Sequence, residues 1–479
     1  MTTDATVQRH DNRGRLSVLD GSFLRMETGY VQMQMGFSTV WAAPTDRPRP
    51  SIEPWRAQAA SRLDTVPWSR WKLDGAPLGL SEPRWVADHD FDLRAHIVAL
   101  TAQDDEVSRE SFEALRDMFF STPLDRRRPL WQFALVPRLR DGRVGCVGKV
   151  HHSLVDGIGA MQFAAMIFDR EPNPEPPAPS SSVTPWRPPT RAGRLGWAID
   201  SLTQTLDAGA GALRDAAAVI ADPQATADGV LRRARLLADT VRDDVLPPAP
   251  ASALNATIGA RRTLVGYQPR REDLLAARTN GGGTFNDIGV AIVAGAMRRL
   301  ALQQGDPPDA PMKAMIPVST REIGDTAAGN RLAMVTIPLA THLESPRERL
   351  EHVRDQMREL KHADRTAAAG ELSSAAALLP PPLRSPVVRA LSGPRQFNLM
   401  VSNPPTPRGS LYLLGCELEE LYTAIPITEG HTLAIGFSRY GGELFIACYA
   451  DPDALPEVHE LPALMEAELH ALMPAVAAV

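Results

Sequence analysis

The sequence predicts a mixed α/β or α+β protein built of two lobes. Residues 131–150 and 432–450 each have the pattern of a strand hairpin, and they lie in opposite halves of the chain. Helical patterns occur in both halves without strict strand–helix alternation, and no internal repeat is evident. A proline-dense stretch at residues 171–190 separates the halves. At 479 residues, the chain is long enough for two or three domains.

Both hairpins are predicted from two apolar strands that flank a polar or glycine-containing turn. In the first half, Trp131–Pro137 and Val144–Val150 flank a turn that contains Asp141-Gly142. In the second half, Thr432–Tyr440 and Glu443–Ala450 flank two adjacent glycines. We therefore expect antiparallel strand pairs at both places.

Two helices of the second half are predicted from their N-terminal signals. Thr284 with Asp287 three residues later resembles a capping box, and a helix rich in small residues follows over Ile288–Leu300. Ser345 with Glu348 forms a second such box, with a proline at the first helical position. The apolar stripe expected on this second helix consists of Leu350, Val353, Met357 and Leu360.

These elements lead to four predicted segments. Residues 1–14 are polar and are expected to be disordered, and ordered structure should begin near Leu16 in an N-terminal lobe of residues 15–170. Residues 171–250 are expected to form a proline-rich linker and a helical excursion. The spacing of the excursion favours helices packed on the protein over an amphipathic surface for lipid. Residues 251–479 form the predicted C-terminal lobe.

The composition excludes several classes of function. Because the formal net charge is -6 and the chain has no long basic block, we do not expect it to bind nucleic acid. No apolar run is long enough to span a membrane and no secretion signal is present, so we expect a cytoplasmic protein. Contact with the inner membrane face or with lipid bodies would be peripheral. The three cysteines are too few and too scattered for disulfides or a zinc site: Cys146, Cys416 and Cys448.

The run His151-His152-Ser153-Leu154-Val155-Asp156-Gly157 is the strongest functional signal. Histidine titrates near neutrality, which suits removal of a proton from an alcohol, amine or thiol as it attacks an acyl group. Neighbouring residues on a strand point to opposite faces, so one histidine should be the base and the other structural. The alternative is a pair of core histidines without a catalytic role.

Other chemistries find little support in the sequence. A serine hydrolase would need a Gly-x-Ser-x-Gly elbow, which the chain lacks, and Ser153 has no flanking elbow glycines. Cys146 lies within a predicted strand, which disfavours a cysteine nucleophile. Metal-ligand spacing, a phosphate-binding loop and a dinucleotide fingerprint are not found. A base without a protein nucleophile implies direct transfer, with both substrates bound together.

The motifs of the chain resemble those of the bacterial wax ester synthase/acyl-CoA:diacylglycerol acyltransferase family, within the CoA-dependent acyltransferase superfamily. The resemblance covers almost the whole length. Any one motif is weak, but the order in which they occur is specific. They are Leu16-Ser17-Val18-Leu19-Asp20 with Phe23-Leu24, Pro129-Leu130-Trp131, His151–Gly157, Asn286-Asp287, Pro317-Val318-Ser319 with Arg321, Gly329-Asn330-Arg331, and Asn398–Asn403.

The resemblance implies a fold of two chloramphenicol-acetyltransferase-like lobes with a tunnel between them. It also implies roles for the motif residues. His152 would be the general base that deprotonates an acceptor hydroxyl, His151 its support, and Asp156 a structural residue. We hypothesise that Arg321 pairs with Asp156. Four further residues would support the site or line the channel: Gly157, Asn286, Ser402 and Asn403. For Asn286, a role in starting its helix is the alternative.

The reaction implied is transfer of a long-chain acyl group from acyl-CoA to diacylglycerol or a fatty alcohol, forming triacylglycerol or a wax ester. Acyl-CoA is then a substrate, and we expect no cofactor and no metal. Residues Pro404–Pro407 depart from the Val-Pro-Gly-Pro run of many members, and the acceptor stays open. Alternatives are a secondary-metabolite, polyketide-type or condensation-like enzyme and a catalytically silent lipid-binding protein. The protein would be a monomer or a homodimer.

Overall fold

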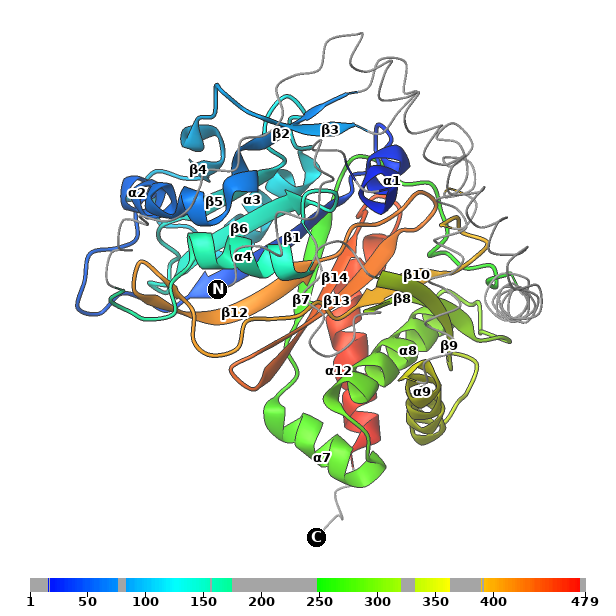
Figure 1. The fold of residues 1–479 in the computed structure, drawn as a ribbon. Helices are drawn as coiled ribbons and strands as arrows, with labels where there is room; N and C mark the ends of the chain where they lie inside the picture. The colour runs from blue at the N-terminus through cyan, green and yellow to red at the C-terminus, as the bar shows by residue number, and fades with distance from the viewer. Residues whose placement is uncertain are drawn as a thin grey trace, which may run out of the picture.

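Two six-stranded sheets form the framework of the part of the chain that the structure describes (Figure 1). The computed structural model describes residues 16, 18–75, 83–155, 157–174, 248–319, 332–361, 389 and 392–473. The predicted disordered segment 1–14 and nearly all of the predicted excursion at 171–250 lie outside these residues.

The first sheet has the strand order β11-β12-β1-β6-β5-β4. Its helices are α1, α2, α3 and α4, and a short hairpin of β2 and β3 stands apart from it. The bounds are α1 Val18–Met26, β1 Gln34–Trp41, α2 Ile52–Arg62, β2 Trp71–Asp74, β3 Arg84–Ala87, β4 Ile97–Ala99, α3 Arg109–Ser121, β5 Trp131–Val136, β6 Val144–His151, α4 Gly157–Ile167, β11 Tyr412–Leu413 and β12 Cys416–Ala424.

The second sheet has the order β7-β14-β13-β10-β8-β9, and in Figure 1 helices α8, α9 and α12 lie together against it. Its elements all come from the second half of the chain. They are β7 Thr263–Tyr267, α7 Arg271–Gly281, α8 Phe285–Gln303, β8 Met312–Ser319, β9 Leu332–Leu339, α9 Pro346–Lys361, β10 Leu399–Ser402, β13 Leu433–Tyr440, β14 Glu443–Ala450 and α12 Leu461–Leu472.

Both predicted hairpins are confirmed. Strands β5 and β6 pair antiparallel, and Gly142 in their turn has a φ of 86°. Strands β13 and β14 pair along their whole length around Gly441 and Gly442, whose φ values are 59° and 88°. A two-residue turn that follows the twist of the sheet requires positive φ at both of its central residues. Glycine adopts positive φ without strain.

The predicted helix starts are also confirmed. Thr284 caps α8, and the side chain of Asp287 accepts the Thr284 backbone N–H, which completes the capping box. The Ser345 hydroxyl accepts the backbone N–H of Glu348 at 3.4 Å at the start of α9. The stripe expected on α9 is buried in the second core, where all four of its apolar residues pack.

One strand crosses between the halves of the chain. Strand β12, from the second half, pairs antiparallel with β1 and so extends the sheet of the first half. Its Glu420 carboxylate accepts two hydrogen bonds from Arg109 of α3, at 2.7 and 3.1 Å, and one from Arg143 at 2.8 Å. The predicted division at residues 171–250 did not anticipate this exchange, and the segment boundaries themselves stay a prediction.

Helix α3 provides further links between the halves. Its Arg116 donates to the Leu264 carbonyl of β7, and the Asp117 carboxylate accepts the Thr263 hydroxyl at 2.5 Å and the Leu264 N–H at 3.2 Å. Because α3 also packs near β6, the strand that carries the histidine motif is tied to the second half. No helix among the described residues is long and apolar enough to cross a membrane.

Lys149 of β6 anchors the C-terminal end of α3. Its side chain is 1% exposed, and its ammonium donates to the carbonyls of Phe119 at 2.6 Å and Thr122. A cation is favoured at the negative end of a helix dipole. Burial nevertheless lowers the pKa of Lys149 to about 7.

The pKa of Lys149 predicts a pH-dependent contribution to stability. In the unfolded chain lysine keeps its proton up to a pKa near 10.4, whereas the folded protein releases this one near pH 7. Because the unfolded state then binds more protons, the free energy of unfolding should rise by about 2 kcal/mol between pH 7 and 9 from this group. Urea unfolding of wild type and Lys149→Met at both pH values measures the difference. Equal pH slopes in the two proteins would contradict it.

Candidate active site

His151 is the last residue of β6 and is held inside the protein. Its side chain is 3% exposed, and its backbone N–H donates to the Leu130 carbonyl at 2.9 Å. The Nδ1 atom accepts the backbone N–H of Ser153 at 3.0 Å and lies 2.7 Å from the Ser153 hydroxyl. Since a backbone N–H can only donate, Nδ1 carries the lone pair and the ring proton lies on Nε2.

The Nε2 proton of His151 is directed at Glu27, at the end of α1. The distance from Nε2 to the Glu27 Oε1 is 3.0 Å, and the same oxygen accepts the backbone N–H of Met33 at 3.0 Å. Arg126 donates to the second carboxylate oxygen. Burial raises the pKa of the Glu27 carboxyl, but His151, Arg126 and the Met33 N–H outweigh it and lower the pKa to about 2. Glu27 is therefore an ionised acceptor at neutral pH.

His152 follows the strand and has a different environment. It is half-buried, and its ring stacks on Phe23 of α1 with centroids 4.0 Å apart and planes inclined by 25°. Its backbone N–H donates to the Met33 carbonyl at 2.8 Å. Met33 thus contacts Glu27 through its N–H and His152 through its carbonyl. Because Glu27 also accepts from His151, Met33 links the position of His152 to the residue that holds His151.

Glu27 and Phe23 were not singled out individually from the sequence. Phe23 belongs to the opening segment that carries the family resemblance, and Glu27 lies four residues further on. The resemblance of that segment to the family indicated that residues near position 20 contribute to function. It could not show that α1 packs against the end of β6, about 120 residues away in the chain.

Substitution of Glu27 should impair catalysis without removing a group that touches substrate. Glu27→Ala leaves the His151 Nε2–H and the Met33 N–H without their shared acceptor, so the end of β6 should shift. A displacement on the order of 1 Å can cost about 100-fold in rate, so we expect that loss in kcat with little change in KM. Glu27→Gln keeps an acceptor oxygen and should recover most of the activity. Equal kcat values for wild type and Glu27→Ala would refute this role.

A second group of predicted site residues lies on the second sheet and its helices. Ser402 is the buried last residue of β10, where it pairs with Gly436 of β13. Next to it, the Asn403 side-chain amide donates to the Asn286 carbonyl oxygen at 3.2 Å. Asn286 is the second residue of α8, and its own amide lies 4.0 Å from the Met357 sulfur. The structure therefore brings Asn286 and Asn403 together from positions 117 residues apart.

Three predicted residues receive little or no description. Asp156 and Arg321 lie outside the described residues, so the proposed pair between them stays a prediction. Gly157 is the first residue of α4. The segment 151–155 before it turns sharply, with the Leu154 N–H bonded to the His151 carbonyl at 2.9 Å.

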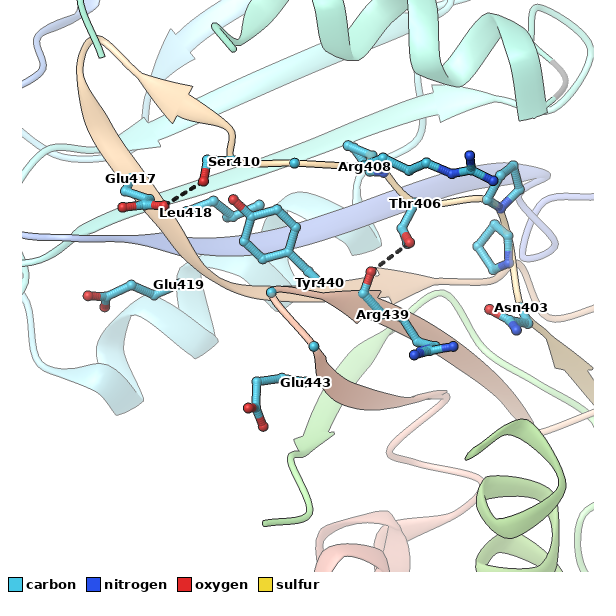
Figure 2. A pocket seen from close by; sticks show the side chains of 16 residues that line it. Asn403, Thr406, Arg408, Ser410, Glu417, Leu418, Glu419, Arg439, Tyr440 and Glu443 are labelled. Atoms are coloured by element: carbon cyan, nitrogen blue, oxygen red, sulfur yellow. Dashed lines mark hydrogen bonds between the residues drawn. The ribbon is translucent and has the colours of Figure 1, made fainter. Parts of the chain in front are cut away.

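An open groove of about 820 Å³ adjoins Asn403. It lies between residues 403–410, part of β12 and the turn between β13 and β14, and Figure 2 shows its lining side chains. The prolines that depart from the family pattern form one wall, and the Thr406 hydroxyl fixes that wall to the Arg439 carbonyl at 2.6 Å. Neither histidine lines this groove.

Family models match both halves of the chain. The model described as the wax ester synthase/diacylglycerol acyltransferase catalytic domain matches residues 16–289, more than half of the chain, and the model of the WS/DGAT C-terminal domain matches residues 328–473. Two proteins of Mycobacterium tuberculosis H37Rv, both named "Putative diacyglycerol O-acyltransferase", are similar over nearly the whole length. One is 28% identical, covering 96% of this chain and 90% of its own, and the other is 27% identical, covering 96% and 100%.

Solved structures show the same fold. The wax ester synthase/diacylglycerol acyltransferase from Marinobacter aquaeolei VT8 aligns with a TM-score of 0.63 at 22% identity, covering 96% of this chain and 98% of its own. The first condensation domain of the calcium-dependent antibiotic synthetase aligns with a TM-score of 0.59 at 15% identity, covering 96% and 95%. The expected two-lobed acyltransferase architecture is thereby confirmed, whereas the tunnel between the lobes stays a prediction.

Proposed function

Because the chain belongs to the wax ester synthase/diacylglycerol acyltransferase family, we propose that its histidine motif catalyses direct acyl transfer with His152 as general base. The protein is an acyl-CoA-dependent O-acyltransferase that forms triacylglycerol or wax ester.

The observation that carries the assignment is the contrast between the two histidines. Both ring nitrogens of His151 are engaged, one by Ser153 and the other by Glu27, and the ring is buried. To accept a proton at Nδ1, His151 would have to give up the Ser153 contacts. The ring of His152 is more exposed and is oriented by Phe23, which supports its role as the group that meets substrate.

In the proposed step, the imidazole of His152 removes the proton of the acceptor hydroxyl as its oxygen attacks the thioester carbonyl of acyl-CoA. The tetrahedral intermediate collapses, the C–S bond breaks, and CoA leaves as a thiolate. A thiol pKa near 8.5 makes this a good leaving group, and the imidazolium returns its proton to the sulfur. The step assigns no role to a cofactor or metal, since acyl-CoA is itself a substrate.

The remaining predicted residues receive supporting roles in this proposal. The Asn286–Asn403 amide pair is proposed to line the channel that leads to the base, because the two side chains meet at the end of β10. Ser402 lies beside this pair. Asp156 is assigned to holding the turn after the motif, paired with Arg321. Diacylglycerol and fatty alcohol are the proposed acceptors, and any contact with a membrane or lipid body is proposed to be peripheral.

Product analysis with the purified protein tests the activity. Palmitoyl-CoA is supplied with dioleoylglycerol, hexadecanol or an amine acceptor, and both free thiol and lipid product are quantified. Thiol release matched by triacylglycerol or wax ester is the expected result. Thiol release without ester would indicate hydrolysis, and product only with the amine would indicate a condensation-like enzyme. Either outcome would overturn the proposal.

A further inference from the structure

We propose that the groove beside Asn403 binds the phosphates of the acyl-CoA nucleotide through Arg408 and Arg439, which line it, and through Arg278, which contacts the same Phe285 ring as Arg439. This inference rests on the proposed function, because it names where the donor substrate of that reaction is held. Two features carry it: an arrangement of arginines around one aromatic ring, and the separation of charge along the groove.

Two guanidinium groups converge on Phe285, the first residue of α8. Arg439 of β13 lies 5.3 Å from the ring centroid, and Arg278 of α7 lies 5.5 Å from it. Both distances are within the range of a cation–π contact. Among the described residues, no ion pair links either arginine to a carboxylate, whereas other arginines such as Arg109, Arg143 and Arg349 make one. Phe285 thus has two guanidinium groups within 5.5 Å of its ring centroid, and an anion bound by both would offset their like charge.

The groove is polarised in charge, as Figure 2 shows. Arg408 and Arg439 extend toward the end where Asn403 lies, while Glu417, Glu419 and Glu443 lie toward the opposite end. Glu417 is engaged by the Ser410 hydroxyl at 2.8 Å. The formal net charge of the chain is -6, so this basic end is a local feature and not a consequence of overall composition.

A multiply charged phosphate ligand fits this end. Arginine binds phosphate oxygens through paired N–H groups, and an arginine without a carboxylate partner loses no ion pair when it does so. The nucleotide of CoA carries a diphosphate and a further phosphate on the ribose, which can engage several guanidinium groups at once. The Asn286–Asn403 pair lies next to Phe285 and at the same end of the groove.

Strand register places this end within reach of the histidines. Ser402 pairs with Gly436, and the Gly436 backbone packs against the Thr423 carbonyl of β12. The next residue of β12, Ala424, pairs with Gly36 of β1, whose neighbouring β6 ends in His151. Strands lie about 4.8 Å apart, so β10 and β6 are separated by about 20 Å. The long pantetheine arm of CoA suits a span of this order.

Steady-state kinetics with two acyl donors test the proposal. Arg439→Gln and Arg278→Gln should each raise KM for palmitoyl-CoA about 5- to 20-fold with little change in kcat, as expected for loss of a charge-assisted contact. With the palmitoyl thioester of N-acetylcysteamine, which lacks the nucleotide, neither variant should change KM. The control is Arg347→Gln, an exposed arginine of α9 paired with Glu351, which should behave as wild type with both donors. Equal effects on both donors, or on neither, would overturn the inference.

Calorimetry separates failure of this inference from failure of the proposed function. Adenosine 3′,5′-bisphosphate should bind the wild-type protein, and Arg439→Gln should weaken that binding by a similar factor. Inorganic phosphate at the same concentration should bind far more weakly, since it carries fewer charges. Nucleotide binding without acyl transfer would refute the function and leave the phosphate site standing. Acyl transfer together with nucleotide binding that Arg439→Gln leaves unaffected would refute the phosphate site and leave the proposed function standing.

Discussion

His152→Ala is expected to lower kcat for acyl transfer by about 10²- to 10⁴-fold, the usual contribution of a general base. The loss should fall on kcat, because the histidine acts on the proton that moves in the transition state and not on the bound thioester. KM for acyl-CoA should change little. The measurement is thiol release from palmitoyl-CoA with a saturating acceptor, for the wild type and the variant.

The environment of His152 indicates that this substitution removes the imidazole without unfolding the protein. Its ring is half-buried and packs on Phe23, so truncation to alanine should leave the melting temperature nearly unchanged. His89, an exposed histidine of the same half, provides the control, and His89→Ala should keep wild-type kcat. A His152→Ala protein that is folded and retains wild-type turnover would refute the role of the base and revive the interpretation as a silent lipid-binding protein.

Glu468→Ala is expected to destabilise the protein by about 3–5 kcal/mol. Glu468 of α12 is fully buried and accepts hydrogen bonds from Arg349 of α9 and, at 3.3 Å, from Arg299 of α8. Gly295 of α8 permits this approach, since a Cβ there would lie 2.0 Å from the carboxylate carbon. Removal of the carboxylate leaves the Arg349 guanidinium buried without its counter-ion. Chemical denaturation measures the loss.

Two further variants separate the ion pair from general packing. Glu466→Ala changes an exposed carboxylate of the same helix and should stay within about 0.5 kcal/mol of the wild type. The double variant Glu468→Leu with Arg349→Met removes both charges, and it should be more stable than Glu468→Ala because no unpaired ion remains buried. A loss below 1 kcal/mol for Glu468→Ala would show that the pair contributes little.

The elements that could be predicted from the sequence are those specified by neighbouring residues. The β5–β6 and β13–β14 hairpins follow from apolar alternation around a glycine turn, and the start of α8 follows from the Thr284–Asp287 box. The motif pattern also led to the correct family, because order along a chain is a property of sequence alone. The base, the Asp156–Arg321 pair and the tunnel are predictions that still await a test.

Contacts between segments far apart in the chain could not be predicted from local sequence patterns. Nothing local to residues 416–424 indicates that β12 joins the sheet of the first half, since a strand pairs equally well with any edge that its register fits. The same holds for Glu27, which becomes an acceptor for His151 only when α1 packs across the end of β6. Likewise, Asn286 and Asn403 meet because α8 begins where β10 ends in space.

The sequence by itself determined the family, the mixed fold and the residues of the histidine motif, because each depends on residue type and spacing. The resemblance assigned the two histidines different roles, but only the tertiary structure showed their different environments. It buried His151 between Ser153 and Glu27, left His152 more exposed on Phe23, and placed Arg408 and Arg439 at one groove with Arg278 on the same Phe285 ring as Arg439. Burial and charge proximity arise when segments far apart in the chain pack together, so they are decided by the fold as a whole.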